Sequence, residues 1–283
     1  MAASHWTVAR ETIEFARGAI IMGVLNVTPD SFSDGGQFAE VDNALTHALQ
    51  MVSDGARIID VGGESTRPGA ESVCDTEELR RVVPVISRLA ARSGVLISID
   101  TSKANVARAA LEAGASIIND ISGGRADEEM MPLAAESDAG FIIMHMQGTP
   151  RTMQTAPRYD DVVREVGEFF RQQYARALEC GIKPMAIALD PGIGFGKTLD
   201  HNLALLRQLP ELRIEDRPLV VGVSRKSFLG KIIGSNVMAD RLAPALALTA
   251  LLRERGADVL RVHDVKPNVA ALRAAETLLA AAP

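Results

Sequence analysis

Residues 20–36 read IIMGVLNVTPDSFSDGG, and they show the pattern on which the whole chain is built. An apolar run stops at Asn26 and gives way to a polar loop that contains Pro29 and the pair Gly35-Gly36. Core packing fixes a strand of this kind, and the polar side chains after it face solvent or substrate. The stretch therefore predicts a buried strand followed by a functional loop.

The same unit recurs along the chain, usually as a glycine, a continuous apolar segment and a polar residue. The further predicted strands lie within residues 55–60, 94–99, 114–118, 140–144, 185–189, 219–223 and 256–260. Continuous apolar strands indicate burial on both faces, as in a parallel sheet. A glycine just before such a strand is expected past the C-terminus of a helix, where φ is positive.

Amphipathic segments separate these strands, so the chain has eight strand–helix units, the number that closes a TIM barrel. The predicted helices are Asp42–Ser53, Thr76–Arg92, Lys103–Ala113, Asp161–Glu179, Arg241–Arg255 and Asn268–Ala280. The fold class is thus α/β, a (β/α)8 barrel, with residues 6–16 as a short N-terminal hairpin or cap. An open doubly wound sheet is the alternative, but no Gly-x-Gly-x-x-Gly motif follows the first strand. No linker divides the chain, so we expect one domain over residues 1–283.

Composition narrows the class of protein. The 283 residues are 47% hydrophobic and carry a net charge of −6, which argues against general nucleic-acid binding. No apolar run approaches the ~18 residues of a membrane span, and the N-terminus lacks the apolar core of a signal peptide. Cys74 and Cys180 show no metal-binding spacing, so we expect two free thiols and a cytoplasmic protein.

Polar side chains collect where the predicted strands end. They are Asn26, Asp60, Asp100, Asn119, Asp190, Lys226, Arg261 and His263. Any one of the Asp and Asn residues could simply cap a helix. Their repetition at the same end of successive units, together with Lys and Arg, favours an active site at the carboxyl ends of the strands.

Two groups of cations suit an anionic ligand. Arg67 lies in the loop Glu64–Gly69, where a guanidinium could hold two oxygens of a phosphate, although a solvated surface arginine remains possible. Lys226 and Arg261 follow the seventh and eighth strands, where this fold commonly binds phosphate. His263 could add a donor or could be structural.

Other chemistries find little support in the sequence. The glycine-rich stretch 190–197 lacks the Gly-Lys-Ser/Thr ending of a nucleotide phosphate loop. His145, at a strand end, could be a base, but it has no matched Ser or Cys nucleophile. No HExxH motif or cysteine cluster suggests zinc.

Taken together, these motifs resemble those of the dihydropteroate synthases. The matching segments are residues 25–36, 63–69, 98–101, 118–120, 144–148, 190–197, 224–227 and 261–265. The resemblance implies a TIM barrel that condenses (7,8-dihydropterin-6-yl)methyl diphosphate with 4-aminobenzoate in folate biosynthesis. It also implies a homodimer formed through outer helices, assistance by Mg²⁺, and competition by sulfonamides for the 4-aminobenzoate site.

The resemblance further assigns roles to individual residues. Pterin diphosphate would be bound by Thr66, Asp100, Asn119, Met144, Asp190, Phe195, Gly222, Lys226, Arg261 and His263. The 4-aminobenzoate pocket would use Phe32, Arg67, Pro68 and Ser227, beneath a mobile loop with Thr28, Asp30, Ser31 and Asp34. Asn26 would be the ligand to Mg²⁺, and Arg67, Asp100, Lys226, Arg261 and His263 would be catalytic.

Two other functions remain open at this point. A related pterin-binding barrel passes a methyl group to a corrinoid protein, but it has no use for the loops at residues 28–34 and 65–69. An inactive pterin-binding homologue would be expected to have lost Arg67, Asn26 or Lys226, and this chain keeps all three.

Overall fold

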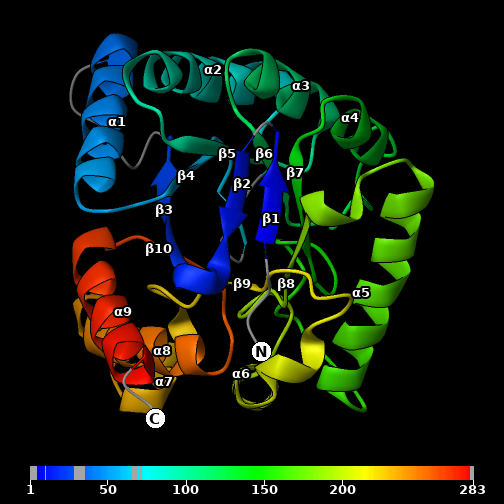
Figure 1. Ribbon diagram of the computed structural model, residues 1–283, viewed down its shortest axis with the longest axis vertical. Coiled ribbons are helices and arrows are strands. Elements are labelled where there is room, and N and C mark those ends of the chain that lie inside the picture. Colours follow the sequence, from blue (N-terminus) through cyan, green and yellow to red (C-terminus); the bar gives the residue numbers. More distant parts are fainter. Residues whose placement is uncertain (1–4, 10, 29–35, 66–68, 71, 281–283) are drawn as a thin grey trace.

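A computed structural model of the chain describes residues 5–9, 11–28, 36–65, 69–70 and 72–280. Eight parallel strands form a ring, ordered β8-β7-β6-β5-β4-β3-β10-β9 (Figure 1). Their bounds are β3 (Ile20–Asn26), β4 (Ile58–Gly62), β5 (Leu96–Asp100), β6 (Ile117–Asp120), β7 (Gly140–Met144), β8 (Ile187–Asp190), β9 (Val220–Val221) and β10 (Val259–Val262). A bridge between Leu189 and Leu219 joins the two ends. The (β/α)8 barrel is confirmed.

Helices surround the strands as an outer ring (Figure 1). They are α1 (Gly36–Ser53), α2 (Asp75–Arg92), α3 (Ala104–Glu112), α4 (Met130–Glu136), α5 (Val162–Glu179), α6 (Leu199–Arg207), α7 (Ser227–Ile233), α8 (Leu242–Glu254) and α9 (Val265–Ala280). Short 3-10 turns occur at η1 (Phe15–Arg17), η3 (Pro184–Ala186), η4 (Leu209–Leu212) and η5 (Ala239–Arg241). The six predicted helices are confirmed with shifted ends, while the short helices α4, α6 and α7 are not among those six, because so few turns give little periodic signal.

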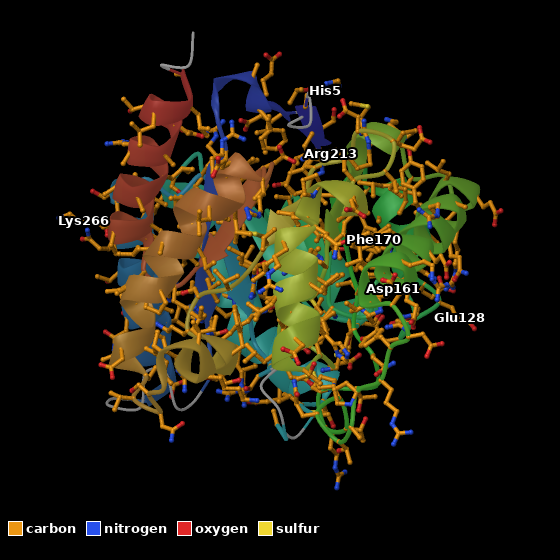
Figure 2. All side chains as sticks on the ribbon, turned by 90° about the horizontal axis from the view of Figure 1, so that it is seen from below. His5, Glu128, Asp161, Phe170, Arg213 and Lys266 are labelled. Carbon is orange, nitrogen blue, oxygen red and sulfur yellow. The ribbon has the colours of Figure 1, made fainter. Side chains whose placement is uncertain are left out.

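The predicted N-terminal hairpin is also confirmed. Strands β1 (His5–Val8) and β2 (Glu11–Glu14) pair antiparallel, and Figure 2 shows His5 at one end of the molecule. Trp6 is fully buried, and its Nε1 donates to the carbonyl of Ala186 over 2.8 Å. The hairpin therefore closes the end of the barrel at which the strands begin.

The barrel interior consists of layers because successive side chains of a strand point to opposite faces. The layer next to the hairpin is apolar: Met22, Ile58, Leu96, Ile117, Ile142, Ala188, Val220 and Val259 pack against Trp6 and its neighbours. Two residues further along each strand come Val24, Asp60, Ser98, Asn119, Met144, Asp190, Gly222 and Arg261. The strand register sets Asp60 beside Val24 and Ser98, and Met144 beside Asp190. An apolar floor thus lies under a largely polar layer.

Two smaller predictions have mixed outcomes. The glycines before the strands have positive φ at Gly55, Gly114 and Gly256, but not at Gly94 or Gly140, for which the prediction was wrong. Gly140 instead is the first residue of β7, and an added Cβ there would meet the Trp6 ring at 3.2 Å. The two cysteines are free thiols, as predicted. Among the described residues, no helix is long and apolar enough to cross a membrane.

Candidate active site at the carboxyl ends of the strands

Four polar side chains predicted from the strand ends meet inside the barrel mouth. Asp60, Asp100, Asn119 and Asp190 are at most 7% exposed. They come from β4, β5, β6 and β8, and the register sets Asp100 directly beside Asn119. The strands hold them in place because apolar residues in the same strands pack against the surrounding helices.

Arg261, in β10, connects two members of this group. Its Nε donates to Oδ2 of Asp60 over 2.6 Å, and its Nη2 donates to Oδ2 of Asp100 over 2.6 Å. The amide of Asn119 donates to the same Asp60 oxygen over 3.1 Å. Arg261, assigned by resemblance to the diphosphate, therefore bridges the carboxylates of Asp60 and Asp100.

Two acceptor atoms in this cluster stay unsatisfied. Within the described part of the chain, Oδ1 of Asp60 and Oδ1 of Asp100 are buried and accept no hydrogen bond. Buried carboxylate oxygens are normally hydrogen-bonded, since leaving one unpaired costs about 1–3 kcal/mol or more. The pair of oxygens is suited to a ligand that presents N–H donors.

Burial and charge together shape the proton affinities here. Burial raises the pKa of Asp100 to about 7, although the Arg261 cation pulls the other way, and burial also raises the pKa of Asp190. Burial would lower the pKa of Arg261, but the carboxylates of Asp60 and Asp100 outweigh it and raise that pKa. The raised pKa of Asp100 and the raised pKa of Arg261 are consistent with each other, because three carboxylates share only two cations in this site. Arg261 therefore stays charged, and one of the acids holds its proton more readily.

Lys226 supplies the second cation. Burial lowers the pKa of Lys226 to about 8, opposed by the nearby Asp190 carboxylate. Its ammonium donates to the carbonyl of Ile193 and lies 4.6 Å from the centre of the Phe195 ring. The cation is therefore at the edge of the loop that follows β8.

An apolar patch lies beside the polar cluster. Ile121, Met144, Met146, Met153 and Phe195 are each at most 9% exposed and form a group separate from the main core. Methionine and aromatic side chains suit contact with the faces of a flat ring. The mouth thus combines hydrogen-bonding groups for a ring edge with apolar groups for its faces.

His145 does not have the properties of a general base. Burial, together with the charges of Lys197 and Arg125, lowers its pKa to about 2. Its Nδ1 lies 2.9 Å from the ammonium of Lys197, and its ring packs edge-on against Phe169 at 4.9 Å between centroids. The structure makes it part of a buried pair and not a proton acceptor for a substrate.

The remaining described candidates lie around the same mouth. Asn26 is the last residue of β3. Gly62 pairs with Asp100 in the strand register, and a Cβ placed at Gly62 would lie 3.9 Å from Oδ1 of Asn26. His263 follows β10 and is 3.2 Å from the hydroxyl of Ser224 through its Nδ1.

Further candidates sit at the mouth or outside the described part. Ser227 is exposed at the start of α7, Gly222 lies against Arg261, and Thr28 follows β3 with a half-buried side chain. Seven candidates fall outside the described residues: Asp30, Ser31, Phe32, Asp34, Thr66, Arg67 and Pro68. Their assigned roles stay predictions.

Sequence reasoning missed two residues of this site. Asp60 was noted as a strand-end group but received no role, although it accepts from both Arg261 and Asn119. Lys197 was read only as part of a glycine-rich loop, yet its side chain is 3% exposed. A charged residue at an inward-facing strand position was the signal for Asp60. For Lys197, nothing in the sequence distinguished a buried lysine from a solvated one.

Comparison with known proteins agrees with this geometry. The model of the family described as "Pterin binding enzyme" matches residues 22–263. The chain belongs to the pterin binding enzyme family. A member from Escherichia coli (strain K12), named dihydropteroate synthase, is 49% identical over 261 residues, which is 92% of each protein. The resemblance drawn from the motifs is therefore confirmed.

Solved structures of family members superpose along the whole chain. Dihydropteroate synthase from Xanthomonas albilineans with 4-aminobenzoic acid has a TM-score of 0.92 at 41% identity and covers 100% of both chains. The same enzyme in complex with 7,8-dihydropteroate has a TM-score of 0.88 at 38% identity, covering 99% of this chain and 100% of that one. The Yersinia pestis enzyme in a sulfonamide complex has a TM-score of 0.91 at 44% identity, covering 98% and 100%.

Proposed function

We propose that this chain condenses (7,8-dihydropterin-6-yl)methyl diphosphate with 4-aminobenzoate to give 7,8-dihydropteroate and diphosphate in folate biosynthesis. One observation carries the proposal: the buried carboxylates of Asp60 and Asp100 keep unpaired oxygens next to two cations at the mouth of the barrel. The named relatives and the ligands in their structures support it.

The carboxylates and the amide fit a pterin ring. A pterin edge presents adjacent N–H donors, which a carboxylate accepts in pairs. The groups that bind this edge are Asp100, Asp190 and Asn119. The unpaired Oδ1 of Asp100 can accept a hydrogen bond from the pterin without breaking an existing one. Oδ1 of Asp190 already accepts from the amide of Gly192 over 2.7 Å, so its other oxygen serves the ring. Phe195 and Met144 contact the ring faces.

Arg261 changes partners when substrate binds. In the structure its guanidinium pairs with both Asp60 and Asp100. Pterin N–H groups replace it at Asp100, which frees the guanidinium to meet the diphosphate together with His263. Thr66 and Arg67 join them from the loop at residues 64–69. The net effect is that charge stays balanced in a site that excludes water.

Mg²⁺ fits the donor set at this mouth. No hydrogen bond joins the side-chain amide of Asn26 to another described residue, and an amide oxygen is a ligand suited to a hard cation. The described residues hold no group of three His, Cys, Asp or Glu side chains that could bind a metal alone. Mg²⁺ commonly uses one or two protein oxygens and completes its shell with substrate phosphate and water. When bound, the ion would neutralise charge on the leaving diphosphate.

The reaction is a dissociative displacement. The bond between the methylene carbon and the diphosphate oxygen breaks, and its electron pair leaves with diphosphate. Arg261, His263 and Arg67 stabilise that negative charge, while Asp100 and Asp190 stabilise the positive pterin. The amine of 4-aminobenzoate then forms the new C–N bond and releases a proton to solvent. An arylamine is nucleophilic without a strong base, which agrees with the low basicity of His145.

The remaining parts of the proposal concern the second substrate and the assembly. The proposed contacts for 4-aminobenzoate are Ser227, Phe32, Arg67 and Pro68. Ser227 is the member of this set that lies in the described part of the chain, where it is exposed next to Lys226. Sulfonamides compete for that pocket, and the sulfonamide complex of the Yersinia pestis relative supports this. The chain forms a cytoplasmic homodimer through its outer helices. Leu251 on α8 and Leu278 on α9 support the dimer, because they are 47% and 76% exposed.

One assay separates the proposed function from its alternatives. The protein is incubated with pterin diphosphate and Mg²⁺, with and without 4-aminobenzoate, and diphosphate and dihydropteroate are measured. The proposal expects both products in equal amounts and only when 4-aminobenzoate is present. A pterin-binding methyltransferase or an inactive homologue would bind the pterin and release no diphosphate, and that result would overturn the proposal.

A further inference from the structure

Lys197 is a buried lysine to which the proposed reaction gives no role, and burial lowers its pKa well below the ordinary value. Its side chain is 3% exposed. Its Nζ lies 2.9 Å from Nδ1 of His145, and 3.3, 3.1 and 3.0 Å from the carbonyl oxygens of His145, Gly192 and Phe195. The N–H donors of a buried lysine need such acceptors, and here they come from the segments that follow two neighbouring strands.

The partners of Lys197 belong to the two segments that contact the pterin ring. His145 directly follows Met144 at the end of β7, and Phe195 lies in the loop after β8. Gly192, in the same loop, donates to Asp190 over 2.7 Å. Lys197 therefore sets the spacing among three residues of the pterin site. They are Met144 and Phe195, which contact the two faces of the ring, and Asp190, whose carboxylate lies at its edge.

The loop at residues 191–196 depends on side chains because it contains no helix or strand. The carbonyl of Ile193 accepts from Lys226, that of Gly194 from Gln154 over 2.8 Å, and that of Gly196 from Tyr159 over 2.9 Å. Gln154 is exposed, and the Lys226 and Tyr159 bonds are only partly buried. Lys197 is the fully buried member of this set.

Close backbone approach makes that contact sensitive to geometry. Gly192 has φ of +62°, and a Cβ added there would lie 1.9 Å from the carbonyl oxygen of His145. The loop thus packs directly on the end of β7, and the Lys197 ammonium sits at that junction. Thr198 then caps α6 by accepting from the amide of His201, so the chain on the other side of Lys197 is also held.

We infer that Lys197 is a positioning residue for the pterin slot. Its Nζ keeps the loop 191–196 against the end of β7 when Lys226 leaves the Ile193 carbonyl to bind the pterin. This inference rests on the proposed function. Lys226 cannot serve substrate and loop at once, and Lys197 has no access to substrate, so the structure divides the two tasks between two lysines.

The consequence is a specific loss of pterin affinity. Without Lys197, three carbonyls and His145 lose their donor, and the loop relaxes to find water. Lys197→Met should weaken binding of 6-hydroxymethylpterin about 10- to 100-fold and raise the KM for pterin diphosphate by a similar factor. The KM for 4-aminobenzoate, measured at saturating pterin diphosphate, should stay within about twofold.

Arg213→Met is the matched control. Arg213 is another buried cation, 2.8 Å from the carboxylate of Asp258 and bonded to the carbonyls of Arg217 and Gly256. Figure 2 shows it at the same end of the molecule as His5, away from the barrel mouth. We expect the variants Arg213→Met and Lys197→Met both to have lower thermal stability than the wild type. Arg213→Met should leave the affinity for pterin unchanged.

The experiment titrates 6-hydroxymethylpterin calorimetrically into wild type and both variants, beside the steady-state assay. If Lys197→Met is insoluble, Lys197→Gln takes its place, with a smaller loss of affinity because the two N–H donors of the amide remain. Pterin affinity within about twofold of wild type in the folded variant would overturn the inference, since a structural lysine alone gives that result. Failure of the wild type to make dihydropteroate would instead overturn the proposed function.

Discussion

Removing the Arg261 guanidinium tests whether one cation neutralises two buried acids. Arg261→Met takes away the partner of Asp60, which is fully buried, and of Asp100, which is 7% exposed. Removing one member of a buried ion pair typically costs about 3–5 kcal/mol of folding free energy, because the other charge stays buried and unpaired. We expect a loss of this order at neutral pH and above.

The pH dependence of that loss identifies the acid responsible. The pKa of Asp100 is raised from 3.8 to about 7 in the folded chain, so its contribution to stability is complete below its ordinary pKa and is lost as pH rises toward 7. Arg261 holds that pKa down. In Arg261→Met the loss therefore continues above pH 7, by about 1.4 kcal/mol per pH unit, or about 2 kcal/mol more at pH 8.5 than at pH 7.

Urea unfolding followed by circular dichroism measures this difference. Wild type and Arg261→Met are compared at about pH 5.5, 7.0 and 8.5, and the gap between them should widen with pH. The double variant Arg261→Met/Asp100→Asn is the control, and its gap to Asp100→Asn should not widen. Equal destabilisation by Arg261→Met at all three pH values would refute the reasoning.

Three further predictions follow from the same site. Gly192→Ala should lower the melting temperature and abolish pterin binding, because its Cβ would overlap the His145 carbonyl; unchanged binding by calorimetry would contradict this. Asn26→Ala should raise the Mg²⁺ concentration needed for half-maximal turnover by about tenfold and leave 6-hydroxymethylpterin affinity alone, whereas an unchanged Mg²⁺ requirement would remove Asn26 as a ligand. Arg67→Ala should cut turnover by about a hundredfold, and a fully active variant would exclude Arg67 from charge stabilisation.

Much of the fold could be predicted because each strand carries its own signal. Continuous apolar runs such as Ile58–Ile59 and Phe141–Met144 are buried on both faces, and their number gave the barrel. The short helices α4 and α6 could not be found in this way. The prediction of a positive φ at Gly140 was wrong because this glycine already belongs to strand β7 and does not end the preceding helix.

The site was predictable where side chains follow the strand period and not where they pair over long range. Because side chains alternate along a strand, the residues two positions after Ile58 and Leu96, which are Asp60 and Ser98, and then Asp100, point to the same face. The sequence therefore indicates the inward-facing polar layer. That Arg261 lies across both carboxylates depends on the closure of the ring, which brings β10 next to β3. The pairing of Lys197 with His145 depends on the path of a loop, for which sequence offers no rule.

The most direct test of the central claim is the affinity of the chain for a pterin that carries no diphosphate. We predict that 6-hydroxymethylpterin binds the wild type, releasing heat in a calorimeter, and that Asp100→Asn shows no measurable binding, because the amide replaces one of the two carboxylate acceptors with an N–H donor and removes the negative charge that the ring N–H groups need. An Asp100→Asn protein that folds normally and binds this pterin with nearly wild-type affinity would contradict the claim.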